Sequence, residues 1–306
     1  MDPESCTLAT CSLEDAYIHY QPTIAGNSVY AALFGILLIA QIIQFPLYRM
    51  WGFSGSMIAG LVLEVLGYAA RILFHDDPFS FDYFLMQVPN LICLSIAPVF
   101  FCAALYFLLG RIVIAYQGED ISRLRPRNYA IFFVSCDIIA LILQSAGGAM
   151  TSSAEDSAGR DVGVNIMIAG LAFQVAALTL FIALTSEFAY RLRRRSRGGP
   201  ATVDGQSRKD AFAGIREKRR WKIFLFALAL ATITVYTRSI FRVIELNGGF
   251  DSELANDEIA FMVLEGGMVS ITCICLTALH PGLALGQGRR NKRESDLELI
   301  EPALAS

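Results

Sequence analysis

The chain has 306 residues, of which 55% are hydrophobic, and its mean hydropathy of +0.50 is far above that of an ordinary soluble domain. This composition favours a lipid bilayer as the solvent for most of the chain. The formal net charge of −3 hides a segregation of basic and acidic residues into different loops, so the total says little about partners. No nucleic-acid partner is expected.

Residues 1–27 predict an N-terminal tail and not a removable signal peptide, because they contain four acidic residues, no Lys or Arg and no apolar core. The first membrane helix must therefore direct the chain to the membrane. Cys6 and Cys11 in this tail could form a local disulfide in an oxidising compartment. The other five cysteines lie in apolar segments, where a thiol packs as a small hydrophobe.

Seven apolar stretches reach the roughly 20 residues that a helix, rising about 1.5 Å per residue, needs to cross a hydrocarbon core about 30 Å thick. They run approximately over residues 28–47, 54–74, 88–109, 129–149, 164–186, 221–241 and 259–280. We therefore predict an all-α integral membrane protein whose seven-transmembrane-helix bundle occupies residues 28–280. An external tail at 1–27 precedes this bundle, and a cytosolic, disordered tail at 281–306 follows it.

Lys and Arg are concentrated in the connections on one side of the predicted bundle, where 20 of them fall, against two on the other side. Because basic residues resist translocation, the basic face is predicted to be cytosolic, with the N-terminus outside and the C-terminus inside. The connection from Arg191 to Arg220 holds eleven of these residues and predicts a flexible cytosolic linker. Its basic run either sets the topology alone or also contacts anionic lipid headgroups.

Polar and ionisable side chains occur within the predicted spans, where each is costly unless it is paired or faces water. We therefore expect them to face the interior of the bundle. At 100° per residue, the second span places Ser56, Gly60, Glu64, Gly67 and Arg71 on one stripe that combines small residues with two opposite charges.

The other spans repeat this pattern. The fourth places Asp137 close in angle to Gln144, the fifth carries Gln174, and the seventh repeats Glu258, Glu265 and Thr272 every seven residues. Pro98 is expected to kink the third span near mid-depth. The candidate substrate-binding residues are Glu64, Arg71, Asp137, Gln144, Arg238, Arg242, Glu245 and Glu265.

The topology predicts the depth of these eight residues, with Glu64 and Asp137 near the middle and the other six in the outer half. We predict a polar chamber of mixed charge that opens outward or is reached sideways from the outer leaflet. Its arginines could hold a phosphate or another anionic headgroup. The alternative is that the charges form ion pairs which fix helix register and bind no ligand.

Several ordered segments resemble the RTA-like family of fungal membrane proteins, also called lipid-translocating exporters. They are GLVLEVLGYAAR at 60–71, APVFFCAALYFLLGRI at 97–112, IFFVSCDIIALILQSAGG at 131–148, GLAFQ at 170–174, RSIFRVIE at 238–245, Glu265, and HPG at 280–282. The resemblance implies a seven-helix plasma-membrane protein associated with export of, or resistance to, amphiphiles, including sphingoid long-chain bases and sterol-like toxins. Some relatives are linked to porphyrin traffic. The implied roles fall on the same eight candidate residues.

A translocator whose partner is a membrane lipid or amphiphilic small molecule is the leading hypothesis. A seven-helix receptor or lipid sensor is the alternative, although the third span ends in Gly110-Arg111-Ile112 without a preceding acidic residue, and the seventh has no Asn-Pro-x-x-Tyr run. Catalytic zinc needs about three protein ligands, and the histidines at 19, 75 and 280 cannot meet, so no metal site is expected. A serine nucleophile is not excluded, but no G-x-S-x-G motif occurs, and an enzymatic function is not expected. No cofactor is expected, no P-loop occurs, and proton coupling through Glu64 or Asp137 stays open.

Overall fold

The computed structural model of the chain describes residues 23–73, 81–116, 123, 126–154, 156–197, 219–247 and 258–284. Nearly all of these residues are helical, and no strand occurs among them. Seven helices are long and apolar enough to cross a membrane, which confirms the predicted seven-helix fold. The tail with Cys6 and Cys11 and most of the predicted linker and C-terminal tail lie outside the described residues, and the orientation in the membrane stays a prediction.

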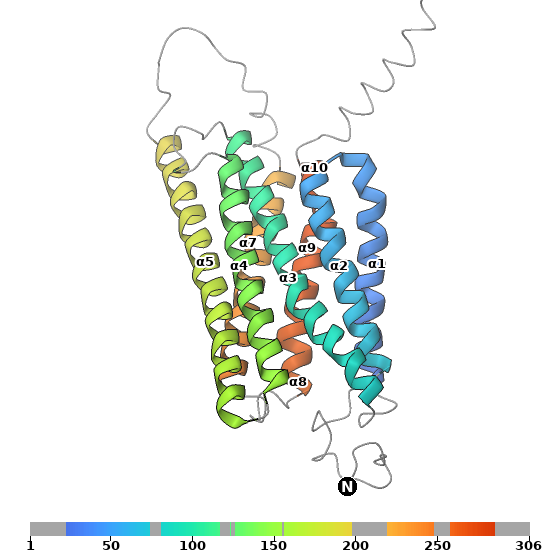
Figure 1. The fold of residues 1–306 in the computed structure, drawn as a ribbon. Helices are drawn as coiled ribbons and strands as arrows, with labels where there is room; N and C mark the ends of the chain where they lie inside the picture. The colour runs from blue at the N-terminus through green and yellow to red at the C-terminus, as the bar shows by residue number, and fades with distance from the viewer. Residues whose placement is uncertain are drawn as a thin grey trace, which may run out of the picture.

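The first six crossings are single helices, and the seventh is built from short segments that follow one another (Figure 1). The elements are α1 (Ile24–Tyr48), α2 (Trp51–Leu73), α3 (Phe81–Ala115), α4 (Pro126–Ser153), α5 (Ser157–Arg197), α7 (Arg219–Asn247), α8 (Glu258–Ala260), the π-helix η3 (Phe261–Gly267), α9 (Met268–Ala278) and α10 (Pro281–Ala284).

Most helices extend beyond the apolar stretch from which they were predicted. The clearest case is α5, whose 41 residues continue through the basic run to Arg197. Hydropathy marks only the part of a helix that crosses hydrocarbon, whereas the helix itself continues as long as its polar residues can reach water or headgroups. The described part of the predicted linker is therefore helical at both ends, since α7 begins at Arg219.

The seven crossings form a closed ring in which each helix packs against the next in chain order and α9 returns to α1. In addition, α3 contacts α7 and α9 and contains the most buried apolar span of the seven. Figure 1 shows α3 running obliquely through the bundle. Side chains on α3 can therefore meet groups from opposite sides of the ring, which is why it contributes to both polar sites described below.

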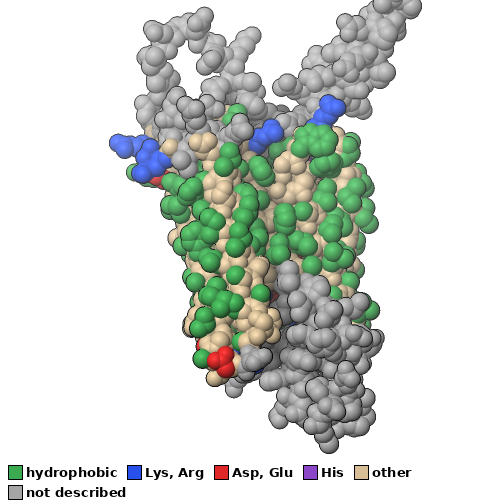
Figure 2. All heavy atoms as spheres, in the orientation of Figure 1, with side chains coloured by type: hydrophobic (Ala, Val, Ile, Leu, Met, Phe, Trp, Pro, Cys, Tyr) green, Lys and Arg blue, Asp and Glu red, His purple; other side chains and the backbone are tan. Residues whose placement is uncertain are grey.

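The outer surface matches a protein surrounded by lipid. Figure 2 shows hydrophobic side chains along the flank of the described helices, Lys and Arg gathered at one end, and an acidic patch at the opposite end. At the basic end, the guanidinium of Arg123 forms an ion pair of 2.8 Å with Glu187, which is also paired with Arg191. The Trp221 indole donates a hydrogen bond of 2.8 Å to the Tyr116 hydroxyl, which joins the start of α7 to the end of α3.

Two glycines allow close approach of neighbouring groups. A Cβ on Gly60 of α2 would lie 2.5 Å from Cε1 of Phe101, so only glycine lets α2 and α3 pack at this distance. A Cβ on Gly282 would lie 2.5 Å from Cγ of Tyr48. The His-Pro-Gly segment after α9 therefore turns tightly against α1, with Pro281 opening the short helix α10.

Candidate functional site

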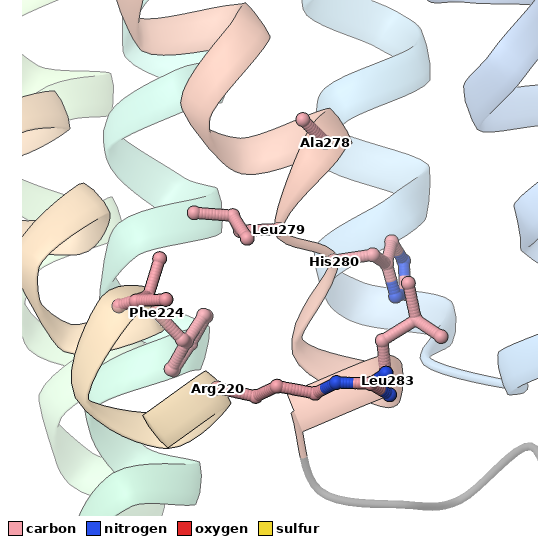
Figure 3. A pocket seen from close by; sticks show the side chains of 7 residues that line it. Arg220, Phe224, Ala278, Leu279, His280 and Leu283 are labelled. Atoms are coloured by element: carbon pink, nitrogen blue, oxygen red, sulfur yellow. The ribbon is translucent and has the colours of Figure 1, made fainter.

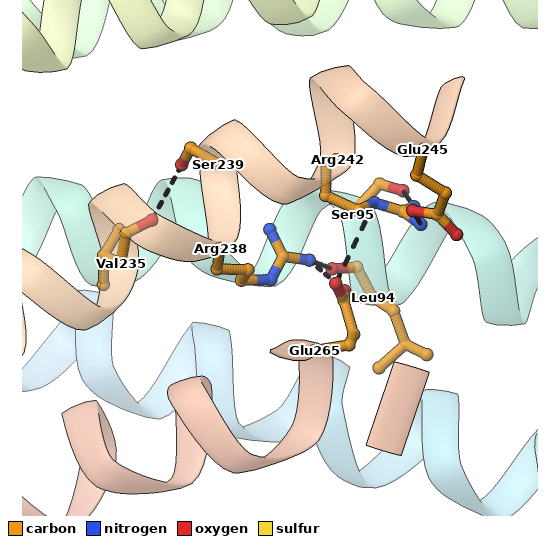
Figure 4. A network of polar contacts seen from close by, with 8 residues as sticks. All are labelled: Leu94, Ser95, Val235, Arg238, Ser239, Arg242, Glu245 and Glu265. Carbon is orange, nitrogen blue, oxygen red and sulfur yellow. Dashed lines mark hydrogen bonds and ion pairs between the residues drawn. The ribbon is translucent and has the colours of Figure 1, made fainter. Parts of the chain in front are cut away.

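Charged side chains from three helices, three of them buried and two partly buried, meet in the half of the bundle nearer to α8 (Figures 1 and 4). We call this group the charge cluster and define it as Glu64 of α2, Arg238, Arg242 and Glu245 of α7, and Glu265 of η3. Under the predicted topology, this half is the outer one.

Arg238 and Glu265 form the central ion pair of the charge cluster. Their side chains are 5% and 2% exposed, so the pair is removed from water. Arg238 Nη2 also donates a hydrogen bond of 2.7 Å to the backbone carbonyl of Leu94 in α3. Because Pro98 has no amide hydrogen, it cannot complete the helical bond to Leu94 four residues earlier, and the arginine satisfies that carbonyl instead.

Arg242 lies beside this pair and extends the network toward α3. Its Nη1 is 2.8 Å from Oε2 of Glu245, one turn away on α7, and its Nη2 donates to the Ser95 hydroxyl at 3.0 Å. Its Nε lies 3.9 Å from the second carboxylate oxygen of Glu265. Both guanidiniums are thus committed to carboxylates, and Glu265 is shared between them.

Glu64 joins the cluster from α2. Its side chain is 2% exposed and interacts electrostatically with Arg238 and Glu265. Its Oε1 atom has no hydrogen-bond partner among the described residues, and the same holds for Glu265 Oε2 and the Tyr68 hydroxyl. The cluster therefore keeps buried acceptor atoms that a polar ligand could use.

Arg71 also lies on the inward stripe of α2, but its described contact differs from those of the other arginines. Its guanidinium carbon lies 3.9 Å above the centre of the Phe261 ring, a cation–π arrangement at the start of η3. The Tyr68 hydroxyl lies close enough to interact electrostatically with Arg71, Glu64 and Glu265. Arg71 is therefore adjacent to the charge cluster and is held by an aromatic ring.

The carboxylate of Glu265 projects from a π-helix, a form found frequently at functional sites. The Tyr30 hydroxyl donates a bond of 2.7 Å to the carbonyl of Met262 inside this segment, which supports the irregular backbone from α1. The seven-residue spacing of Glu258, Glu265 and Thr272 predicts a regular α-helix with these three residues on one face. The wider turns of η3 change the angular relation among these positions, and Thr272 instead bonds to Thr234 at 2.7 Å.

Two predicted site residues lie in other interfaces. Gln144 of α4 donates a hydrogen bond of 3.1 Å to Gln174 of α5. Asp137 of α4 is 1% exposed and lies against Tyr106 of α3. The helical angle of 100° per residue places both on the inner side of α4 but does not say which neighbour each one meets. The structure thus brings together Glu64, Arg238, Arg242, Glu245 and Glu265, with Arg71 adjacent.

A cavity of about 340 Å³ lies at the opposite, basic end of the bundle (Figure 3). It is lined by Arg220, Ile223, Phe224, Ala278, Leu279, His280 and Leu283. His280 Nδ1 accepts a hydrogen bond from the Gly282 amide, so its Nε2 carries the proton and donates to the Ser54 hydroxyl at 3.3 Å. The ring also stacks on Tyr48, so His280 serves to anchor the end of the seventh crossing.

Sequence reasoning missed the neutral partners of the charge cluster: the Leu94 carbonyl, Ser95, Tyr68 and Tyr30. One signal was present for Leu94, because a proline four residues later always removes the amide that a helical carbonyl would bind. The hydroxyl groups gave no comparable signal, since their spacing does not distinguish a buried partner from an ordinary helix residue.

The chain is similar in sequence to a family of membrane proteins with members in yeast. A family model described as RTA1 like protein matches residues 57–288. The sphingoid long-chain base transporter RSB1 of Saccharomyces cerevisiae is 33% identical over 282 residues, which cover 86% of this chain and 72% of the transporter. The S. cerevisiae proteins RTM1 and RTA1 are 27% and 24% identical, covering 67% and 81% of this chain and 60% and 79% of their own lengths. No solved structure matches.

Proposed function

Because this chain belongs to the family of RTA1 like proteins, we propose that it is a plasma-membrane translocator that exports a single-chain amphiphile, of the sphingoid long-chain base type, and thereby gives tolerance of toxic amphiphiles. The observation that carries the proposal is the similarity to RSB1 over most of both chains. The proposal assigns the chain no enzymatic step.

The charge cluster supplies the polar surface that such a route requires. A charged group at the centre of a lipid bilayer costs about 2.5–3.5 kcal/mol on insertion scales. If buried partners removed about 3 kcal/mol from that barrier, crossing would be about 150 times faster, since each 1.36 kcal/mol is worth tenfold. The amphiphile's hydrocarbon tail can meanwhile stay against apolar helix surface.

Some polar atoms in and beside the charge cluster have no described hydrogen-bond partner. They favour a headgroup that both donates and accepts hydrogen bonds over a phosphate, which mainly accepts them. The described contacts already engage Arg238 and Arg242 with glutamates. Acceptor atoms remain at Glu64, Tyr68 and Glu265, and a donor remains at Arg238 Nε. A sphingoid base is an amino alcohol, and its hydroxyl groups, which both donate and accept hydrogen bonds, match this set. In the proposal the eight candidate residues line or support the route, with Gln144 and Asp137 on its α4 side.

The test is transport of a tail-labelled long-chain base and a tail-labelled phospholipid in vesicles reconstituted with the full chain. Protein-free vesicles and the Ser135→Ala variant serve as controls, because Ser135 is exposed on α4 and bonds to the carbonyl of Ile131 in its own helix. We expect protein-dependent movement of the base, reduced at least about tenfold in Glu64→Gln, which removes one buried charge. Equal movement with and without protein would refute the function.

A further inference from the structure

The carboxylate of Asp137 is buried between α3 and α4 without a hydrogen-bond partner. Its side chain is 1% exposed, and neither oxygen receives a hydrogen bond within the described parts of the chain. The adjacent Tyr106 is 0% exposed, and its hydroxyl is also without a partner there. The Tyr106 hydroxyl nevertheless lies close to Asp137 and interacts with it, so three oxygen atoms lie together in the interior, none of them in a hydrogen bond of regular geometry.

This arrangement differs from that of the acids in the charge cluster. Glu265 pairs with Arg238, Glu245 pairs with Arg242, and Glu64 interacts with Arg238. No Lys or Arg in the described segments forms an ion pair with Asp137. A buried carboxylate without a compensating charge is costly.

We propose that Asp137 and Tyr106 form the subsite that binds the primary ammonium group of the transported amphiphile, an inference that rests on the proposed function. A primary ammonium has three N–H donors, and the two Asp137 oxygens with the Tyr106 hydroxyl supply three acceptors. Its positive charge compensates a buried carboxylate that forms no ion pair with an arginine in the described segments. In the charge cluster, by contrast, an ammonium would have to compete with guanidiniums for each glutamate.

The surroundings suit an amphiphile better than a hydrated ion. The rings of Phe133 and Phe181 pack on Tyr106 with centroid distances of 5.2 and 4.8 Å, which gives the subsite apolar walls that carry π-electron density. On the outer side of α4, Ile138 and Ile142 are 50% and 62% exposed. A hydrocarbon chain can therefore remain near the lipid-facing surface while its headgroup reaches the interior.

Ligand binding is tested by thermal unfolding of the full chain in detergent, with sphingosine, its N,N,N-trimethyl analogue and an uncharged N-acylated analogue as probes. Sphingosine should raise the melting temperature, since a ligand that binds the folded state stabilises it. The trimethyl analogue keeps the charge but has no N–H donor, so its effect should be much smaller, and the acylated analogue should have none. Equal effects of sphingosine and the trimethyl analogue, or a shift with sodium chloride alone, would overturn the proposal.

The variants separate the subsite from general loss of structure. Asp137→Asn keeps the shape and removes the charge, and should weaken sphingosine binding at least about tenfold, whereas Tyr106→Phe removes one acceptor and should weaken it by about threefold or more. Ser135→Ala, two residues away on α4, should bind as the unaltered chain does. Unchanged sphingosine binding in Asp137→Asn would reject the subsite.

The same variants in the vesicle assay separate this inference from the proposed function. If the unaltered chain moves the labelled base and Asp137→Asn moves it equally well, the subsite is wrong and the function stands. If the unaltered chain binds sphingosine through Asp137 but moves no labelled base, the transport function fails while the subsite stands. Loss of both binding and transport in Asp137→Asn alone, with unchanged melting of the ligand-free protein, is the result we expect.

Discussion

Replacing Arg238 by methionine removes the central cation of the charge cluster while keeping most of the side-chain volume. The change leaves Glu265, whose side chain is 2% exposed, with only the more distant Arg242 at 3.9 Å. It also leaves the Leu94 carbonyl without the donor that replaces the missing amide of Pro98. Breaking a buried ion pair from one side costs about 3–5 kcal/mol, because the remaining charge is uncompensated.

Two companion variants divide this cost into its parts. Adding Glu265→Gln should recover at least about 2 kcal/mol, since replacing both members of a buried pair is often nearly neutral. Adding Pro98→Ala instead restores an amide for the Leu94 carbonyl. Neutral hydrogen bonds between membrane helices average only about 0.6 kcal/mol. The Arg238→Met, Pro98→Ala double variant should therefore recover no more than about 1 kcal/mol of the free energy of unfolding lost in Arg238→Met.

The assay is reversible unfolding in mixed micelles of a mild detergent and sodium dodecyl sulfate, with the free energy of unfolding extrapolated to the mild detergent. Arg220→Met is the control, because Arg220 is exposed at the basic end, and it should change stability by less than about 0.5 kcal/mol. A cost below about 1 kcal/mol for Arg238→Met, or additivity with Glu265→Gln within about 0.5 kcal/mol, would refute the reasoning that the two charges depend on each other.

Three further predictions use the same unfolding assay. Gly60→Ala should cost about 1–3 kcal/mol through overpacking against Phe101, whereas Gly35→Ala, where a Cβ meets nothing within 4 Å, should cost nothing. Gly282→Ala should lower the melting temperature through its clash with Tyr48, and a shift of zero would contradict the close approach. Gln144→Leu should lower the free energy of unfolding more alone than together with Gln174→Leu, because the single change leaves the buried amide of Gln174 without its partner. Equal losses in the two variants would exclude the hydrogen bond between Gln144 and Gln174.

The residues that the sequence could place are those whose position follows from burial cost alone. Gly60, Glu64 and Arg71 lie on the stripe predicted for α2, and all three are buried. Ser56, on the same stripe, is only partly buried and bonds to the Gly52 carbonyl of its own helix at 2.9 Å. A hydroxyl can satisfy itself locally, so its presence on a stripe carries less information than a charge does.

The identity of the partners could not be predicted, because it depends on which helices are neighbours. Asp137 and Gln144 share the inner side of α4, yet one faces α3 and the other faces α5. The π-helix is a second example, since a seven-residue spacing such as that of Glu265 and Thr272 fits a regular helix equally well. Only the packing of η3 against Tyr30 and Tyr68, which lie close to Gly266, distinguishes the wider turns of a π-helix from a regular α-helix.

The irregular backbone around the charge cluster determines which substitutions can report on transport. Backbone groups freed inside a membrane must be satisfied by other parts of the protein. Arg238 does this for the Leu94 carbonyl, and Tyr30 bonds to the Met262 carbonyl. Loss of flux on replacing either residue would therefore follow equally from a damaged helix. Glu64 and Asp137 form no hydrogen bond to the described backbone, so Glu64→Gln and Asp137→Asn change the charge along the route without removing a backbone partner.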